Sequence, residues 1–294
     1  MNSKSKFKTL VILDLETSGL VYDEPKITEL AIIAVHISTL DEMKSDEELP
    51  RVLNKLVKFF DPRKTIRSKA TELSNLDNHM LKNYASFNHQ TVIAIEHFLN
   101  DFQKPLCFVA HNGNRFDFPI LFNEIQTALR TNDSTSINQI DSSLISIACV
   151  DSINFFREIY RLISDENILD KKHIDNINAS SDLSLSNVVS INRRKYVEIP
   201  IKSNLARQLP SMKLLKIYER ELNRIPILTY HRAEDDCLML LAILKRYLPD
   251  WLQWIDINHR LLSDFTFLPS STTTTKTTKF LSKKNVNCKR PFKF

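Results

Sequence analysis

The stretch LVILDLETSGL, residues 10–20, constrains the fold more than any other part of the chain. Its first four residues are aliphatic, and such an unbroken apolar run predicts a strand that is buried on both faces. Asp14 and Glu16 follow directly. Residues i and i+2 of a strand point to the same face, so both carboxylates should project together from its carboxyl end, where open α/β sheets place their sites.

Strand and helix patterns alternate along the rest of the chain. We expect five strands, at 8–14, 27–37, 54–62, 106–112 and 145–152, from their short apolar runs. Helical spacing of apolar residues predicts helices at 91–102, after 117, after 152, at 211–222 and at 231–248, where Pro249 should end the last one. This order predicts a mixed α/β sheet flanked by helices.

Charge and composition divide the chain into a domain, 1–262, and a basic tail, 263–294. The tail carries seven Lys or Arg and one acid, so the net charge of +5 comes from it. The polar segment 163–205 is expected to be a long insert in the domain, and the tail to be disordered. The tail could hold DNA, direct the protein to the nucleus, or only keep it soluble.

Apolar length and cysteine spacing exclude several classes of protein. No apolar stretch approaches the ~20 residues of a membrane helix, and no secretory leader precedes the first strand. Four widely spaced cysteines suggest neither a zinc site nor a disulfide framework. We therefore expect a soluble protein of the nucleus or cytoplasm, with no membrane partner.

Glycine occurs only twice, as Gly19 and Gly113. A chain that otherwise avoids glycine should have a backbone reason for each one, either a positive φ or a close approach to a ligand. Both lie beside acidic segments, DLETSGL and HNGNRFDFPIL.

Two adjacent carboxylates repel each other unless a cation lies between them, and hard oxygen ligands favour Mg²⁺ or Mn²⁺. A D-x-E pair in a solvated loop is the alternative.

Asp117 starts a helix after a buried strand, where an acid can also serve only as a cap. His231 and Asp236 lie about 140° apart on an ideal helix, so they converge only if His231 precedes the regular helix. Asp236 leads the apolar face of its helix and should point inward.

These pieces form an ordered set: D-x-E, then N-x-x-x-F-D ending at Asp117, then H-x-A-x-x-D from His231 to Asp236. The set resembles the DEDDh group of DnaQ-like 3′→5′ exonucleases. The segments ITELAIIAVH, VAHNGNRFDFPIL, VDSINFF and HRAEDDCLMLL resemble the three-prime repair exonuclease family over residues 8–255. The resemblance implies a ribonuclease H-like fold with a mixed five-stranded sheet.

The same resemblance implies a mechanism. Asp14, Glu16, Asp117 and Asp236 would hold two Mg²⁺ ions, with Mn²⁺ as a substitute, and His231 would be the general base. The five residues together would be the catalytic set. The product would be a nucleoside 5′-monophosphate released from a 3′ end.

The resemblance also suggests substrate contacts and an assembly. Leu20 and Leu73 match wedges against the terminal bases, and hydroxyls or N–H groups at Thr17 and Ser18 would meet the 3′-terminal nucleotide. Arg115 and Phe116 flank the third acid, and Arg115 would meet a phosphate. Each of the six could equally have a core or surface role. Members of the family pair through a sheet edge, which suggests a homodimer.

Three functions follow as hypotheses. The leading one is a metal-dependent 3′→5′ exonuclease that degrades single-stranded or frayed DNA. The same active-site set would serve an RNA exonuclease, because the choice depends on how the 2′-OH is received. A non-catalytic nucleic-acid-binding module is the third, and the presence of all five catalytic positions argues against it.

Overall fold

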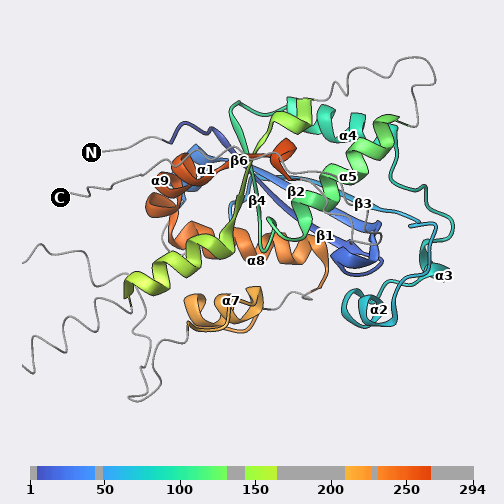
Figure 1. The fold of residues 1–294 in the computed structure, drawn as a ribbon. Coiled ribbons are helices and arrows are strands. Elements are labelled where there is room, and N and C mark those ends of the chain that lie inside the picture. Colours follow the sequence, from blue (N-terminus) through green and yellow to red (C-terminus); the bar gives the residue numbers. More distant parts are fainter. Residues whose placement is uncertain (1–4, 44–48, 131–142, 164–208, 227–230, 266–294) are drawn as a thin grey trace, which may run out of the picture.

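A six-stranded mixed sheet forms the centre of the molecule (Figure 1). The computed structural model describes residues 5–43, 49–130, 143–163, 209–226 and 231–265. The strands, in the spatial order β3-β2-β1-β4-β5-β6, are β1 Thr9–Thr17, β2 Ile27–His36, β3 Asn54–Phe59, β4 Leu106–Ala110, β5 Ala148–Asp151 and β6 Arg260–Leu261. All five expected strands are present. The sixth was missed because two residues are too few to show a period.

Strand directions place the expected site at one end of the sheet. β1 pairs antiparallel with β2 and parallel with β4, and β4 pairs parallel with β5. β3 and β6 are antiparallel edge strands on β2 and β5. The carboxyl ends of β1, β4 and β5 therefore lie at the same end of the sheet.

Helices cover both faces of the sheet (Figure 1). One layer holds α4 His89–Asn100 and α5 Asp117–Arg130. The other holds α7 Leu214–Leu222, α8 Ala233–Arg246, α9 Leu248–Asn258 and the helical residues 152–163. Short elements complete the chain: α1 Ile37–Glu42, α2 Ser68–Ser74, α3 Asn78–Leu81, η1 Val21–Asp23, η2 Ser143–Ser146 and η4 Leu262–Asp264.

The alternation of side chains along β1 divides the core into two clusters. Val11, Leu13 and Leu15 pack toward α4 and α5, whereas Leu10 and Ile12 pack toward α8. Asp14 and Glu16 continue the second row, so both carboxylates lie on the α8 side of the sheet. Asp14 and Glu16 thus share one face of β1, as their spacing predicts, and α8 covers that face.

The expected long helix at 231–248 is instead two helices. α8 ends at Arg246, and α9 begins at Leu248 with proline in its first turn. Proline lacks an N–H, but the first turn of a helix leaves that donor unpaired anyway. Pro249 therefore helps to start a helix. The helix α9 was not predicted from the sequence, because Pro249 was expected only to end the preceding helix.

Two expectations concern segments that lie almost wholly outside the described residues, namely the insert 163–205 and the tail 263–294.

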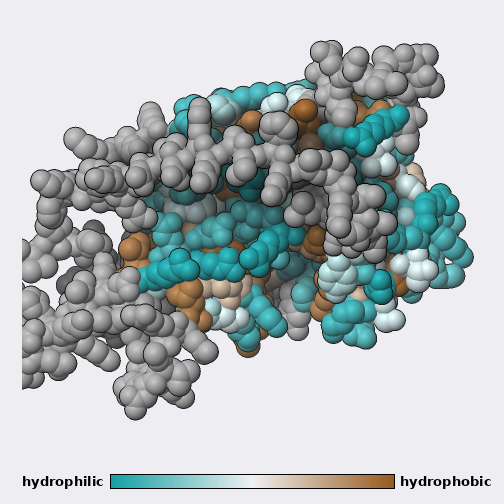
Figure 2. Space-filling view, viewed as in Figure 1, coloured by the Kyte–Doolittle hydropathy of each residue, from teal (hydrophilic) through white to brown (hydrophobic). Residues whose placement is uncertain are grey.

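On the face that Figure 2 shows, hydrophilic side chains cover much of the described surface and hydrophobic ones form smaller patches. Among the described helices, none combines the length and apolar character needed to cross a membrane.

Candidate active site

Asp14 and Glu16 lie where β1 extends past β4. The pairing of β1 with β4 ends at Ile12, while the pairing with β2 continues to Thr17. Both side chains are partly buried. Among the described residues, no protein donor forms a hydrogen bond or ion pair with either carboxylate. Two acids without partners at the end of a buried strand leave room for a ligand that supplies positive charge.

Asp117 reaches this strand end from the opposite layer. It is the first residue of α5 and only 2% exposed. Its Oδ1 accepts a hydrogen bond from the Leu15 N–H at 3.1 Å. This N–H lies beyond the last residue of β1 that pairs with β4, so the carboxylate takes the place of a strand partner. Asp117 is thereby held beside Asp14, and the positive end of the α5 dipole favours its charge.

His231 and Asp236 meet on the entry turn of α8. His231 precedes the helix, which starts at Ala233, and has a left-handed φ of 65°. Its N–H donates to Asp236 Oδ2 at 3.3 Å. One ligand atom each of Glu16, His231 and Asp236 all lie within 4.8 Å of one another. The geometric condition set by the 140° separation is therefore met.

The crowded acids raise one another's pKa. Burial, then the charges of Asp117, Asp236 and Glu16, raise the pKa of Asp14 well above its ordinary value. Burial and the charge of Asp236 raise the pKa of Glu16 to about 9. The pKa of Asp117 rises to about 8 and that of Asp236 to about 7, in both cases mainly through burial. Cations at the site would reverse these shifts.

The donor set suits divalent metal ions. Four carboxylates offer hard oxygen ligands of the kind that Mg²⁺ and Mn²⁺ prefer. The strongest neighbouring charge is Asp117 for Asp14 and Asp236 for Glu16. The four acids therefore repel one another, and cations bound among them would relieve this repulsion. The cluster is a candidate site for divalent ions.

His231 is suited to accept a proton. Burial and the charge of Lys213 lower its pKa below the ordinary value. The imidazole is therefore neutral at pH 7, as a general base must be. Its neighbours Glu234 and Asp235 were expected to be solvated, but both are only partly exposed. Glu234 forms an ion pair with Lys55 of β3 at 2.8 Å.

Asp151 holds the loop that leads to Asp117, and sequence reasoning missed it. It ends β5 and is 4% exposed. Its Oδ1 accepts from the N–H groups of Asn112 and Ile153, both at 3.0 Å, and its Oδ2 accepts from that of Asn114 at 3.2 Å. A signal was available in the sequence, because β5 repeats the pattern of β1: an apolar run that ends in an acid.

His111 ties the same loop to a third element. One ring nitrogen lies 2.8 Å from Ser152 Oγ, and the other lies 2.7 Å from the carbonyl oxygen of Met212. Burial lowers the pKa of His111, so the neutral ring bridges the two groups. His111 thus ties the loop before α5 to the first residue of the 152–163 helix and to the segment just before α7.

The two glycines are explained by space and not by backbone dihedrals. Neither has a positive φ, so the first of the two expected reasons does not apply. A Cβ on Gly113 would lie 2.6 Å from Phe118 Cε2 and 2.7 Å from Ala110 Cβ. A Cβ on Gly19 would lie 3.0 Å from Asp23 Oδ2. Each glycine permits a close approach of the chain to itself beside the acids.

Two of the six expected substrate contacts use their hydroxyls inside the protein. Thr17 Oγ1 donates to the Gly19 carbonyl at 2.7 Å, and Ser18 Oγ accepts from the Lys26 N–H at 3.0 Å. Both residues are buried, so their side chains shape the loop after β1.

The other four expected contacts lie at least partly on the surface. Leu20 is 50% exposed and Leu73 is 39% exposed. Arg115 is exposed, whereas Phe116 packs partly against the α5-side core. Leu20, Leu73 and Arg115 are therefore accessible to a substrate, and Phe116 supports the loop that carries Arg115.

Comparison with known proteins gives a family and relatives. Residues 11–173 match the model of the exonuclease family RNase_T. The chain is 38% identical over 132 residues to mouse three prime repair exonuclease 2, covering 43% of this chain and 56% of that protein. Human three-prime repair exonuclease 1 is 27% identical over 262 residues, covering 86% and 68%. The expected resemblance to this group is confirmed.

Among solved structures, the zinc-bound form of E. coli exonuclease I with single-stranded DNA has a similar fold. The TM-score is 0.50 at 15% identity, and the match covers 84% of this chain and 42% of that one. The expected ribonuclease H-like fold is confirmed. The chain spans only about half the length of the three prime repair exonuclease 2 proteins that it matches.

Proposed function

The chain belongs to the exonuclease family, and from this premise we propose that it is a metal-dependent 3′→5′ exonuclease that acts on DNA. One observation supports the proposal above all others. Three acids from β1 and α5 and the His231–Asp236 pair of α8 converge at one end of the sheet, without charge compensation from the described residues.

Each residue has a proposed role. Asp14, Glu16, Asp117 and Asp236 would hold two divalent ions, and Mg²⁺ is the proposed physiological ion with Mn²⁺ as a substitute. Bound ions would supply positive charge on both sides of the scissile phosphate. His231 would take the proton of the attacking water, since its lowered pKa keeps the ring neutral. The left-handed turn keeps this ring outside α8, where it can face solvent.

The proposed substrate is the 3′ end of single-stranded or frayed DNA, and the product is a nucleoside 5′-monophosphate. The names of the three prime repair exonucleases support this choice. Leu20 and Leu73 supply exposed apolar groups that can pack on unstacked bases. Arg115 is the proposed phosphate contact.

We propose three further properties of the chain. The catalytic domain would span residues 1–262, and the basic tail would raise DNA affinity or direct the protein to the nucleus; activity in the cytoplasm is equally compatible. Homodimerisation would use a sheet edge, and β3 leaves one edge open within the described sheet.

A gel assay tests the proposal. Wild type and Asp14→Ala are incubated with 3′- or 5′-labelled single-stranded DNA, with Mg²⁺ or EDTA, beside RNA of the same sequence. Shortening from the 3′ end that needs both Asp14 and the metal is the expected result. Preference for the RNA would replace the substrate class, and failure of folded wild type to cut either strand would overturn the proposal.

A further inference from the structure

A carboxylate behind the active site contacts the turn that carries the histidine. Glu29 of β2 lies opposite Glu16 of β1 in the strand register, so the two side chains leave the sheet on the same face. Glu29 is only 1% exposed. It is not among the metal ligands that the family resemblance implies.

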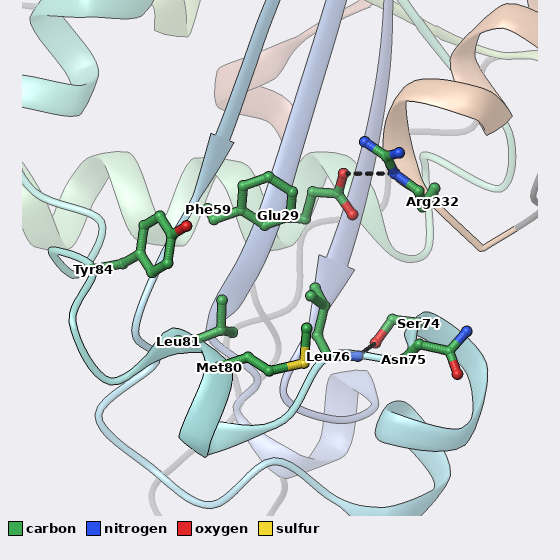
Figure 3. Close-up of a pocket in the computed structure, with 9 residues that line it drawn as sticks. All are labelled: Glu29, Phe59, Ser74, Asn75, Leu76, Met80, Leu81, Tyr84 and Arg232. Carbon is green, nitrogen blue, oxygen red and sulfur yellow. Dashed lines mark hydrogen bonds and ion pairs between the residues drawn. The ribbon is translucent and has the colours of Figure 1, made fainter.

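Glu29 meets two consecutive residues of the entry turn of α8. Its Oε2 accepts from the Ala233 N–H at 3.5 Å. Its Oε1 lies 4.0 Å from Nε of Arg232 (Figure 3). Ala233 is the first residue of α8, and His231 and Arg232 precede it. The N–H of His231 is in turn bonded to Asp236. Three successive residues are thus fixed, two of them through Glu29.

A buried carboxylate needs such partners. Glu29 Oε1 makes no hydrogen bond among the described residues, and Arg232 is the only cation that forms an ion pair with Glu29 there. Arg232 also lies 3.8 Å from Glu234, which pairs with Lys55 of β3. Arg232, in the turn that Glu29 contacts, therefore offsets part of the Glu29 charge, and burial still raises the pKa of Glu29 above its ordinary value.

A cavity of about 310 Å³ borders the pair on its open side (Figure 3). Its wall includes Phe59, Leu76, Leu81 and Tyr84. No side chain of that wall other than Arg232 carries positive charge. The cavity therefore leaves open space beside the Arg232 side chain if its contact with Glu29 is lost.

We propose that Glu29 is a positioning residue that, together with Arg232, fixes the entry turn of α8 so that His231 and Asp236 face Glu16. The inference rests on the proposed exonuclease function. It assigns no contact with substrate or metal to Glu29. Misplacement of a catalytic group by about 1 Å can reduce a rate by about a hundredfold, so loss of Glu29 should act on kcat.

The test compares Glu29→Ala, Glu29→Gln, Arg232→Ala and the double variant Glu29→Gln with Arg232→Ala. The readouts are kcat and KM on 3′-labelled single-stranded DNA with Mg²⁺, together with Tm. Glu29→Ala should lower kcat about 10- to 100-fold, as is typical when the support of a metal or catalytic group is lost. KM should stay within about twofold. Glu29→Gln keeps an acceptor for the Ala233 N–H and should recover part of the lost rate, with a kcat about 3- to 10-fold below wild type.

The double variant separates positioning from DNA contact. If Arg232 acts through Glu29, its removal should add little to Glu29→Gln, and the two effects on kcat should be non-additive. The control is Glu124→Gln. Glu124 is a 3% exposed acid of α5, in the helix layer on the other face of the sheet from α8, and it pairs with Lys26. The kcat of this variant should match wild type.

Several results would overturn the inference. A folded Glu29→Ala variant with kcat within about twofold of wild type would do so, as would equal losses in the Glu124 control. If Glu29→Ala does not fold, unchanged kcat in Glu29→Gln decides against it. Additive effects with a raised KM for Arg232→Ala would assign Arg232 to DNA instead. An inactive wild type would instead overturn the proposed function, and the two failures are thus distinguishable.

Discussion

Replacing Glu16 by Gln should stabilise the metal-free protein while abolishing its proposed activity. The pKa of Glu16 is raised from 4.5 to about 9 by burial and by the charge of Asp236. At pH 7.5 the folded protein therefore keeps a proton that the unfolded chain has released. Each pKa unit corresponds to about 1.4 kcal/mol, so three units give an upper limit of roughly 4 kcal/mol. Because the four acids share their repulsion, we expect a gain of about 1–3 kcal/mol.

The pH dependence gives the prediction its sign. A carboxyl group with a raised pKa stabilises the fold fully below its unfolded value, and this contribution is lost as the pH rises toward the folded value. For Glu16 that window runs from 4.5 to about 9. In EDTA, wild type should lose stability between pH 5 and pH 7.5, and Glu16→Gln should lose less. Urea unfolding at both pH values measures the difference.

A control variant and a measurement with Mg²⁺ complete the experiment. Glu72→Gln, on the exposed face of α2, should match wild type at both pH values. With Mg²⁺ the order should reverse, because wild type gains the free energy of ion binding. A Glu16→Gln variant that is less stable than wild type in EDTA at pH 7.5 would refute the reasoning. An equal difference at pH 5 and pH 7.5 would also refute it, since repulsion between ionised acids must grow with pH.

Other predictions follow from single contacts. Asp117→Asn keeps an oxygen for the Leu15 N–H, so at pH 5 its unfolding free energy should stay within about 1 kcal/mol of wild type, while cleavage falls at least about a hundredfold; urea unfolding and the gel assay check this. Asp151→Asn leaves one oxygen for three N–H donors and should lower single-turnover rates about tenfold. Gly113→Ala should lower the unfolding free energy by about 1–3 kcal/mol through overpacking against Phe118, measured by urea unfolding. Mg²⁺ binding at pH 7.5 should release protons, which calorimetry in buffers of different ionisation enthalpy detects.

The parts of the site that follow a local period could be predicted. The two-residue period of β1 placed Asp14 and Glu16 on one face, and the helical angle placed His231 on an entry turn. Asp151 and Glu29 escaped prediction because their partners are distant in sequence. Asp151 bonds a loop 37–39 residues away, and Glu29 bonds the Ala233 N–H 204 residues away. No period in a single sequence encodes such contacts.

The site exists because β1 is longer than its parallel neighbour. The pairing of β1 with β4 stops at Ile12 of β1, which leaves the backbone of the last residues of β1 without a partner on that side. A buried N–H without an acceptor is unfavourable, and the Asp117 carboxylate satisfies the one at Leu15. The contact draws an acid from the α5 layer to the strand end, while Asp236 arrives from the α8 layer on the other face. Acids from both layers can therefore meet only at the end of the sheet, where no strand separates them. An extension of β4 by two residues would cover Leu15 and displace Asp117, so the strand length itself is part of the proposed catalytic apparatus.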